Sequence, residues 1–175
     1  MAKEPILETE RLILRPLTVD DAEAVFQWAS DPRVAKFMSY PKHTDVSQTI
    51  EWLKSLEDDE TEWTWAFVLK EENKVIGSAG IVPSSAMQGY WGIGYNINYD
   101  YWHNGYCTEA MKAIIDFAHN KLGVNKICSD HAVDNPRSGK VMEKCGLAFH
   151  HNGEYSKIDG SETFKAKFYT LEFWE

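Results

Sequence analysis

The stretch Trp102-His103-Asn104-Gly105-Tyr106-Cys107-Thr108-Glu109 decides the fold, because it joins an aromatic, strand-like run to a clean helical pattern. A strand that turns into a helix through a glycine-containing loop leaves the first helical N–H groups without partners inside the helix. These groups point to one spot near the positive end of the helix dipole, where a phosphate binds favourably. The stretch predicts an anion cradle, although alone it is also compatible with a plain turn in which Gly105 tolerates an unusual backbone angle.

The residues that follow the stretch recur with a helical period. Apolar side chains from Met111 to Leu122 fall on one helix face. Thr108 is a residue type that favours the N-cap position, and Gly123 is a natural C-terminal stop. We therefore expect a helix at 108–122, with the loop held between it and the preceding strand.

Alternation of apolar and polar residues marks strands in the rest of the chain, whereas helical spacing and cap residues mark helices. A strand that follows a crossover helix is expected to run parallel to the strand before that helix. The expected elements, in order, are a strand at 10–15, a helix from Thr18 with Asp21 in its first turn, a helix at 45–56 with a capping box from Asp45 to Gln48, strands at 65–69, 75–82 and 90–99, the helix at 108–122, a parallel strand at 126–133, a helix at 136–146, and closing strands at 147–151 and 164–173 around a turn-rich 153–161.

Composition limits the class of protein. A chain of 175 residues without a Pro/Gly/Ser-rich linker fits one domain over 1–175. Its net charge of −9 opposes a nucleic-acid partner. No stretch is apolar enough to span a membrane and the start lacks the pattern of a signal peptide, so we expect a cytoplasmic protein with no membrane partner. Three cysteines at wide spacings indicate reduced thiols and no zinc site of paired cysteines.

Four motifs, taken in their order and spacing, resemble the GNAT N-acetyltransferases and, more narrowly, the branch that contains the RimJ and RimL ribosomal-protein acetyltransferases. The resemblance covers nearly the whole chain. It implies an α+β fold with a mixed, mostly antiparallel sheet that is flanked by helices and splayed between its fourth and fifth strands, at 90–99 and 126–133. The motifs are Thr9-Glu10-Arg11-Leu12-x-Leu14-Arg15, Gly105-Tyr106-x-Thr108-Glu109-Ala110, Asn135-x-x-Ser138 and Glu143-Lys144-x-Gly146.

The resemblance also implies acetyl-CoA as the cosubstrate, with its pyrophosphate in the cradle and its pantetheine arm beside the strand at 90–99. The family's loop, Gln/Arg-x-x-Gly-x-Gly/Ala, maps onto 102–107, and the chain departs from it at Trp102 and Cys107. Asn98 is equally compatible with a solvent-facing position, and Asn135 with a plain helix cap. The implied cofactor-binding residues are Ile97, Asn98, Trp102, His103, Asn104, Gly105, Tyr106, Cys107, Thr108, Asn135 and Ser138.

Two residues are predicted to be catalytic. Ser138, by resemblance, lies near the thioester sulfur and donates a hydrogen bond to the departing thiolate; the alternative is a hydroxyl bonded back to its own helical turn. His131 is the candidate proton acceptor because its ordinary pKa is closest to neutrality, although a surface or hydrogen-bonded structural histidine is the plainer reading. Asp130, on the opposite face of the strand, is the fallback and would need a raised pKa.

Two further features have competing readings. His150 and His151 suggest metal ligands, but adjacent strand residues point to opposite faces and no third ligand is evident, so no metal is predicted. The acidic run at 57–62 is either a region that attracts a cationic amine or a solvated face.

The sequence thus predicts an enzyme that transfers the acetyl group of acetyl-CoA directly to a primary amine, without a covalent acyl-enzyme. The amine belongs to a small molecule or to a protein N-terminus, and a second copy of the chain in a homodimer is a further option. The alternative is a catalytically silent acyl-CoA sensor or interaction module.

Overall fold

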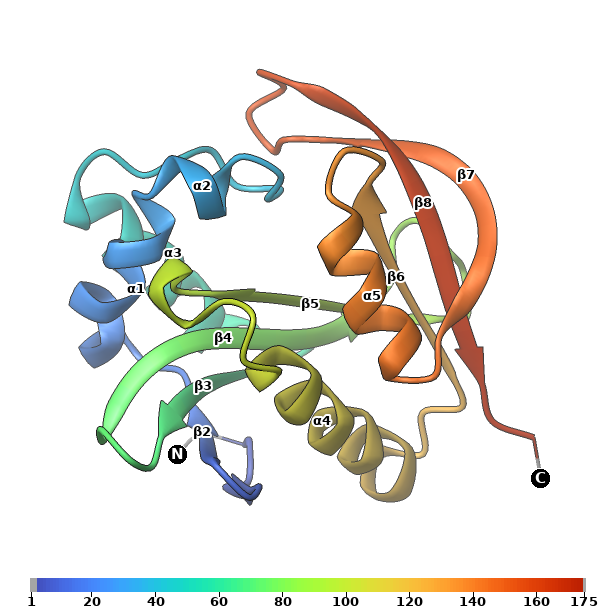
Figure 1. The fold of residues 1–175 in the computed structure, drawn as a ribbon, viewed down its shortest axis with the longest axis horizontal. Coiled ribbons are helices and arrows are strands. Elements are labelled where there is room, and N and C mark those ends of the chain that lie inside the picture. The colour runs from blue at the N-terminus through green and yellow to red at the C-terminus, as the bar shows by residue number, and fades with distance from the viewer. Residues whose placement is uncertain (1–2, 175) are drawn as a thin grey trace.

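The computed structural model describes residues 3–174. Figure 1 shows one open sheet with helices packed against it. In chain order the elements are β1 (Leu7–Glu8), β2 (Leu12–Pro16), η1 (Val19–Asp21), α1 (Ala22–Ala29), α2 (Pro32–Ala35), α3 (Val46–Asp58), β3 (Trp63–Leu69), β4 (Lys74–Pro83), β5 (Trp91–Ile97), η2 (Tyr99–Tyr101), α4 (Tyr106–Leu122), β6 (Lys126–Ala132), α5 (Pro136–Lys144), β7 (Ala148–Ser156) and β8 (Thr163–Glu172).

The sheet has eight strands in the order β1-β2-β3-β4-β5-β6-β8-β7. β5 and β6 run parallel, and each of the other neighbouring pairs is antiparallel. The expected mixed and mostly antiparallel sheet is therefore confirmed. No helix within residues 3–174 is long and apolar enough to cross a membrane.

Both faces of the sheet are covered, as neighbouring residues of β3 demonstrate. Trp65 packs in a cluster with Met111 of α4 and Met142 of α5, whereas Ala66 packs in a second cluster with residues of α1 and α3. Successive strand residues point to opposite faces. Helices α4 and α5 therefore cover one face, and α1 and α3 cover the other.

Strands β5 and β6 pair only at their first residues. Trp91 lies opposite Ile127 and Gly92 opposite Cys128, and no further pairs follow. One side-chain bond continues the contact, from Ser129 Oγ to the carbonyl of Ile93 at 2.9 Å. Beyond it the strands diverge, so the splay expected between the fourth and fifth strands exists and leaves main-chain groups of both strands facing a gap.

Several local predictions are confirmed because they rest on short-range bonds. The carboxylate of Asp21 accepts from the N–H of Thr18 at 3.0 Å, and Asp45 forms a capping box with Gln48. Gly123 ends α4 in the left-handed conformation, with φ of 70°. The sequence does not predict β1.

The cradle differs from its prediction at the helix start. β5 ends at Ile97, and a 3₁₀ turn follows because the Asn98 side chain accepts a hydrogen bond from the N–H of Asp100 at 3.0 Å. Helix α4 then begins at Tyr106 with Gly105 as its N-cap, so the prediction of Thr108 as N-cap is wrong. Gly105 takes this position because its φ of 79° lies in the left-handed region that glycine adopts without strain.

The closing strands are longer than predicted. β7 continues to Ser156, so it includes residues 153–156 of the segment at 153–161 that composition marks as turn-rich, and β8 begins at Thr163. Backbone hydrogen bonds pair the two strands along the hairpin, for example at Tyr155 opposite Phe164. This pairing outweighs the preference of these residues for turns.

A β-bulge changes the expected geometry of the two adjacent histidines. The pairing register of β7 shifts between Phe149 and His151, which leaves His150 as the extra residue. The two rings meet on one side, with their Nδ1 atoms 2.7 Å apart, and the expectation of opposite faces is wrong. No group of three or more metal-ligating side chains occurs within residues 3–174.

Candidate active site

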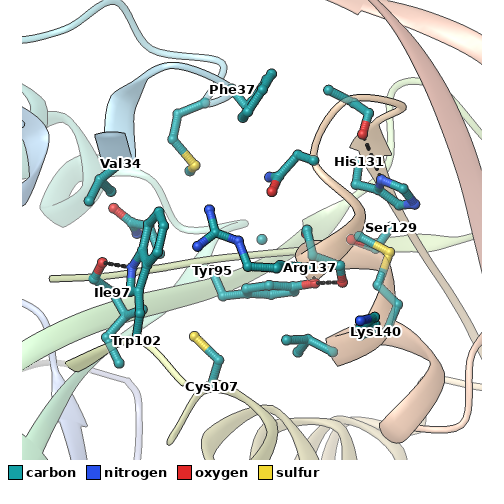
Figure 2. A pocket seen from close by; sticks show the side chains of 18 of the residues that line it. Val34, Phe37, Tyr95, Ile97, Trp102, Cys107, Ser129, His131, Arg137 and Lys140 are labelled. Carbon is teal, nitrogen blue, oxygen red and sulfur yellow. Dashed lines mark hydrogen bonds between the residues drawn. The ribbon is translucent and has the colours of Figure 1, made fainter. Parts of the chain in front are cut away.

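A cavity of about 510 Å³ lies at the splay. Its walls come from β5, β6, the loop before α4 with the first turn of that helix, the length of α5, the α2 segment and the end of β7. Figure 2 shows the side chains that converge there, among them Tyr95, Trp102, Arg137 and His131. All of the sequence-predicted site residues except Asn98 and Asn104 line this cavity.

The loop at the start of α4 is bent into a cradle by two left-handed residues. His103 has φ of 66° and Gly105 has φ of 79°. The Asn104 side chain fixes this bend by donating to the carbonyls of Tyr101, at 3.1 Å, and of Trp102, at 3.0 Å. The first main-chain N–H groups of α4 lack partners within the helix; they belong to Tyr106, Cys107 and Thr108. These three residues lie on the cavity wall. This arrangement suits a phosphate.

The first turn of α4 is fastened to the turn between β1 and β2. Glu109 accepts from the hydroxyl of Thr9 and from Arg11, whose Nε lies 2.8 Å from Oε1. Burial raises the pKa of the Glu109 carboxyl, but these hydrogen bonds outweigh burial and bring the pKa below its usual range. The Thr9 and Arg11 positions of the first motif therefore position the cradle, and Arg11 also places its guanidinium 3.6 Å from the point where a Cβ of Gly105 would be.

Trp102 has a defined role in the loop. Its indole Nε1 donates to the carbonyl of Ile97 at 2.9 Å, and the guanidinium of Arg137 lies over its ring at 3.8 Å. Both contacts are visible in Figure 2. Trp102 thus caps the end of β5 and links it to α5 across the cavity, in place of the polar side chain that the family loop has at this position.

Of the two β5-end positions that the resemblance implies for cofactor binding, Ile97 and Asn98, only Ile97 offers a main-chain group to the splay. The N–H of Asn98 bonds to the carbonyl of Ile76, and its side chain is buried against Gln27, so Asn98 is neither solvent-facing nor free at the splay. Antiparallel pairing with β4 alternates the direction of main-chain groups. By that alternation the N–H and C=O of Tyr95 and the N–H of Ile97 face the gap.

Ser138 is held by a residue that the sequence analysis missed. Tyr95 Oη donates to the Ser138 carbonyl at 2.7 Å and lies 3.0 Å from Ser138 Oγ. The hydroxyl is therefore not bonded back to its own turn. Burial raises the pKa of Tyr95 well above its usual range, so the ring stays neutral and acts as a hydrogen-bonding group. Asn135 precedes the helix but its side chain makes no capping bond, which leaves its amide available at the cavity wall.

His131 and Asp130 point to opposite faces of the sheet. His131 is buried against α5, where its Nε2 lies 2.6 Å from the ideal Cβ position of Gly139, and its Nδ1 is 2.7 Å from the carbonyl of Ala132. Asp130 lies opposite Phe168, and Tyr155 lies opposite Phe164, so the strand period places Asp130 and Tyr155 on the same face. His131 is thus packed as a structural residue, and Asp130 has the more open position.

The carboxylate of Asp130 has chemical properties that suit a proton acceptor. It takes part in none of the side-chain hydrogen bonds and ion pairs described for residues 3–174. Burial raises its pKa above the usual range of an aspartate, and the charge of His131 opposes this only in part. A raised pKa brings a carboxylate closer to the range in which it exchanges protons efficiently.

The thiols near the cavity are poorly suited to nucleophilic attack. Burial raises the pKa of Cys107 to about 12 and that of Cys145 to about 11. Both are free cysteines, as is Cys128, which agrees with the prediction of reduced thiols. A thiol with such a pKa is almost fully protonated near neutrality.

Comparison with known proteins decides the family. The acetyltransferase (GNAT) domain family matches residues 11–148. The chain belongs to the GNAT acetyltransferases. It is 32% identical over 160 residues to the uncharacterised N-acetyltransferase p20 of Bacillus licheniformis, covering 88% of this chain and 89% of that protein.

Solved GNAT structures share the fold. A protein of Vibrio cholerae assigned as a ribosomal-protein-serine acetyltransferase has a TM-score of 0.81 at 19% identity, covering 99% of this chain and 100% of that one. The microcin C7 self-immunity acetyltransferase MccE, solved with acetyl-CoA and AMP, has a TM-score of 0.79 at 16% identity, covering 94% and 93%. The present GNAT protein is accordingly an N-acetyltransferase that depends on acetyl-CoA as its cosubstrate.

Three residues of this GNAT site are not among the cofactor-binding and catalytic residues that the sequence predicts: Tyr95, Arg137 and Arg11. Tyr95 falls in the expected strand, but only the packing of α5 on β6 brings Ser138 to it. Arg11 belongs to the first of the four motifs, and that membership is the sequence signal for a role beside the cradle. Conversely, none of the residues of the acidic run at 57–62 lines the cavity.

Proposed function

We propose that this GNAT enzyme, as a single domain over 1–175, transfers the acetyl group of acetyl-CoA directly to a primary amine of a small molecule or protein N-terminus. The observation that carries the proposal is the placement of Ser138 and Asp130 on opposite faces of the same splay. A thioester in the gap would have a hydrogen-bond donor on one side and a proton acceptor on the other.

The cofactor would bind along a path defined by three elements. The cradle of Trp102, His103, Asn104, Gly105, Tyr106, Cys107 and Thr108 would receive the pyrophosphate at the α4 N-terminus. The main-chain groups of Tyr95 and Ile97 that face the gap would bond the pantetheine amides, as an added strand does. The free amide of Asn135 would bond the same arm from the opposite wall. Asn98 would act indirectly, by ending β5.

In the chemical step the neutral amine attacks the thioester carbonyl carbon, and a C–N bond forms as the C–S bond breaks. Asp130 accepts the proton that the nitrogen loses, and the electron pair of the broken bond stays on sulfur. Ser138 donates a hydrogen bond to that thiolate, held in place by Tyr95. We favour Asp130 over His131 as acceptor because both ring nitrogens of His131 lie near protein partners.

Direct transfer is supported by the state of the nearby thiols. An acyl-enzyme on Cys107 would require a thiolate, and the pKa of about 12 keeps that thiol protonated. The ternary complex therefore needs no covalent intermediate on the protein.

Membership of the RimJ/RimL-like branch is part of the proposal. It is supported by the four motifs and by the structural likeness to the protein assigned as a ribosomal-protein-serine acetyltransferase. The homodimer and the cytoplasmic location stay predictions.

Release of free CoA thiol tests the function. With acetyl-CoA and a panel of amines, we expect amine-dependent thiol release, and Ser138→Ala should lower kcat by about 100-fold with little change in acetyl-CoA affinity. Ser47→Ala, in the first turn of α3, is the control and should leave both unchanged. Acetyl-CoA binding without thiol release for any amine would instead favour the silent sensor.

A further inference from the structure

The two halves of the cavity differ in their chemistry. The half on the α5 face contains the cradle, Ser138 and Tyr95. The half on the opposite face is bounded by Phe37, Met38 and Tyr155, with Asp130 as its carboxylate. The rings of Phe37 and Tyr155 both pack on Phe164, at 5.7 Å and 5.1 Å. If acetyl-CoA fills the first half, the amine must enter this second, largely apolar one.

Asp130 is the only carboxylate among the described residues that line the cavity, whereas four cationic side chains do so. Of the cations, Arg33 is paired with Asp31 at 2.7 Å and lies over the ring of Tyr99 at 3.6 Å. An acceptor with one ammonium group can pair with Asp130. Three of the four cations belong to α5, on the cofactor side, so a second ammonium group would meet Arg33 and aromatic carbon rather than a second carboxylate.

A hydrogen-bonded roof restricts the size of the acceptor. The Tyr155 hydroxyl donates to the carbonyl of Phe37, and the N–H of Ile158 donates to the carbonyl of Ser39 at 2.8 Å. The ammonium of Lys157 donates to the carbonyls of Ala35 at 2.9 Å, Met38 at 2.8 Å and Tyr40 at 3.2 Å. These bonds join the end of β7 and the residues just after it to α2 and the segment that follows it, so an extended peptide that entered across this junction would have to break them.

We infer that the acceptor is a small monoamine whose single amino group is carried by an aromatic or branched aliphatic body, and not a polyamine or a protein N-terminus. The inference rests on the proposed function, because it assigns the substrate class of the same site. The ammonium group pairs with Asp130 on entry and loses one proton to water before it attacks, so that Asp130 can accept the second, and the apolar body packs on Phe37, Met38 and Tyr155.

The test compares three acceptors at saturating acetyl-CoA: 2-phenylethylamine, spermidine and a short peptide with a free N-terminal serine. Thiol release gives kcat/KM for each. We expect 2-phenylethylamine to exceed both others by about 100-fold, the order expected when a buried charge lacks a partner. Equal or faster turnover of spermidine or of the peptide would overturn the inference while leaving the proposed function intact.

A charge-addition variant tests the reason for the preference. Ser39 lines the cavity with an exposed side chain, so Ser39→Asp adds a second carboxylate at the rim. It should raise kcat/KM for spermidine by about 10-fold or more without improving 2-phenylethylamine. Ser55→Asp, on the exposed side of α3 away from the cavity, is the matched control and should change neither.

The remaining outcomes are also decisive. A folded Ser39→Asp enzyme with no gain for spermidine would overturn the charge argument. Acetyl-CoA binding by calorimetry together with no thiol release for any of the three amines would remove the proposed function and this inference with it.

Discussion

At the scale of single residues, the site depends on positions whose backbone or charge state is unusual. Gly105 caps α4 with a left-handed φ, and a Cβ there would meet only Arg11 Nη2 at 3.6 Å. A steric clash is therefore not the reason that this position needs glycine. The requirement comes from the backbone angle and from the space that an anion would occupy.

Gly105→Val should weaken acetyl-CoA binding by about 10-fold or more, because the β-branched side chain disfavours the left-handed angle and fills the cradle. Gly123→Val is the matched control, since Gly123 has φ of 70° at the other end of the same helix. Each variant should lose stability by about 1–2 kcal/mol. Calorimetry of acetyl-CoA binding separates them, and an equal loss of affinity in both would contradict a specific role for Gly105.

Asp130 should produce the acidic limb of the pH profile. The proton acceptor must be ionised, so kcat/KM for the neutral amine should fall as pH falls through the raised pKa of Asp130. Asp130→Asn should abolish that limb and lower kcat/KM by about 100-fold. A limb that persists unchanged in the variant would assign it to another group.

The same variant should be more stable near neutral pH. A carboxyl whose pKa is raised by folding costs stability when it is ionised; the cost is absent below the unfolded pKa and complete above the folded pKa. Asp130→Asn should therefore unfold at higher denaturant concentration than the parent at neutral pH, and the difference should disappear in acid. Urea titrations at the two pH values measure this.

At the scale of elements, the end of β7 is fixed by an ammonium group rather than by turn composition. Lys157 is buried, which lowers its pKa, yet its Nζ donates to three carbonyls, of Ala35 at the end of α2 and of Met38 and Tyr40 beyond it. These bonds compensate for its burial. The result is a tie between two elements that are far apart in sequence and that together roof the acceptor half.

Lys157→Met should loosen this roof. We expect a loss of about 2–3 kcal/mol in stability, because carbonyls that bonded a charged group lose their partner. The KM for the amine should rise several-fold, while the KM for acetyl-CoA stays constant because the cradle is separate. Lys165→Met, an exposed position on β8, is the control. A selective rise in the KM for acetyl-CoA would contradict the assignment of the roof to the acceptor.

At the scale of the whole molecule, one sheet connects every part of the site. β2, β3 and β4 support α4 and the cradle, while β6, β8 and β7 carry Asp130 and the roof, and β5 and β6 join the two groups of strands by only two paired positions. The side-chain bond from Ser129 to Ile93 and the packing of α4 and α5 in one hydrophobic cluster supplement that narrow junction.

We expect the chain to unfold in one cooperative transition, with coincident near- and far-ultraviolet circular dichroism. Acetyl-CoA at about 100 times its Kd should stabilise the fold by about 2.7 kcal/mol, because it binds the folded state alone. Two separate transitions, with only one of them shifted by acetyl-CoA, would show that the groups of strands on either side of the splay fold independently.

The sequence by itself determined the features that depend on neighbours along the chain: the helical period of α4, the left-handed stop at Gly123, the cap pairs at Thr18 and Asp45, and the motifs that identify the family. These signals lie within a few residues of one another, so local geometry fixes them. Tertiary structure alone decided what depends on distant pairing, such as the bond between Tyr95 and Ser138, which are 43 residues apart. The pairing of β6 with β8 placed Asp130 on the face of Tyr155 and buried His131 under α5, because a shift of one residue in that pairing would exchange the faces of the two side chains, and β8 lies far along the sequence.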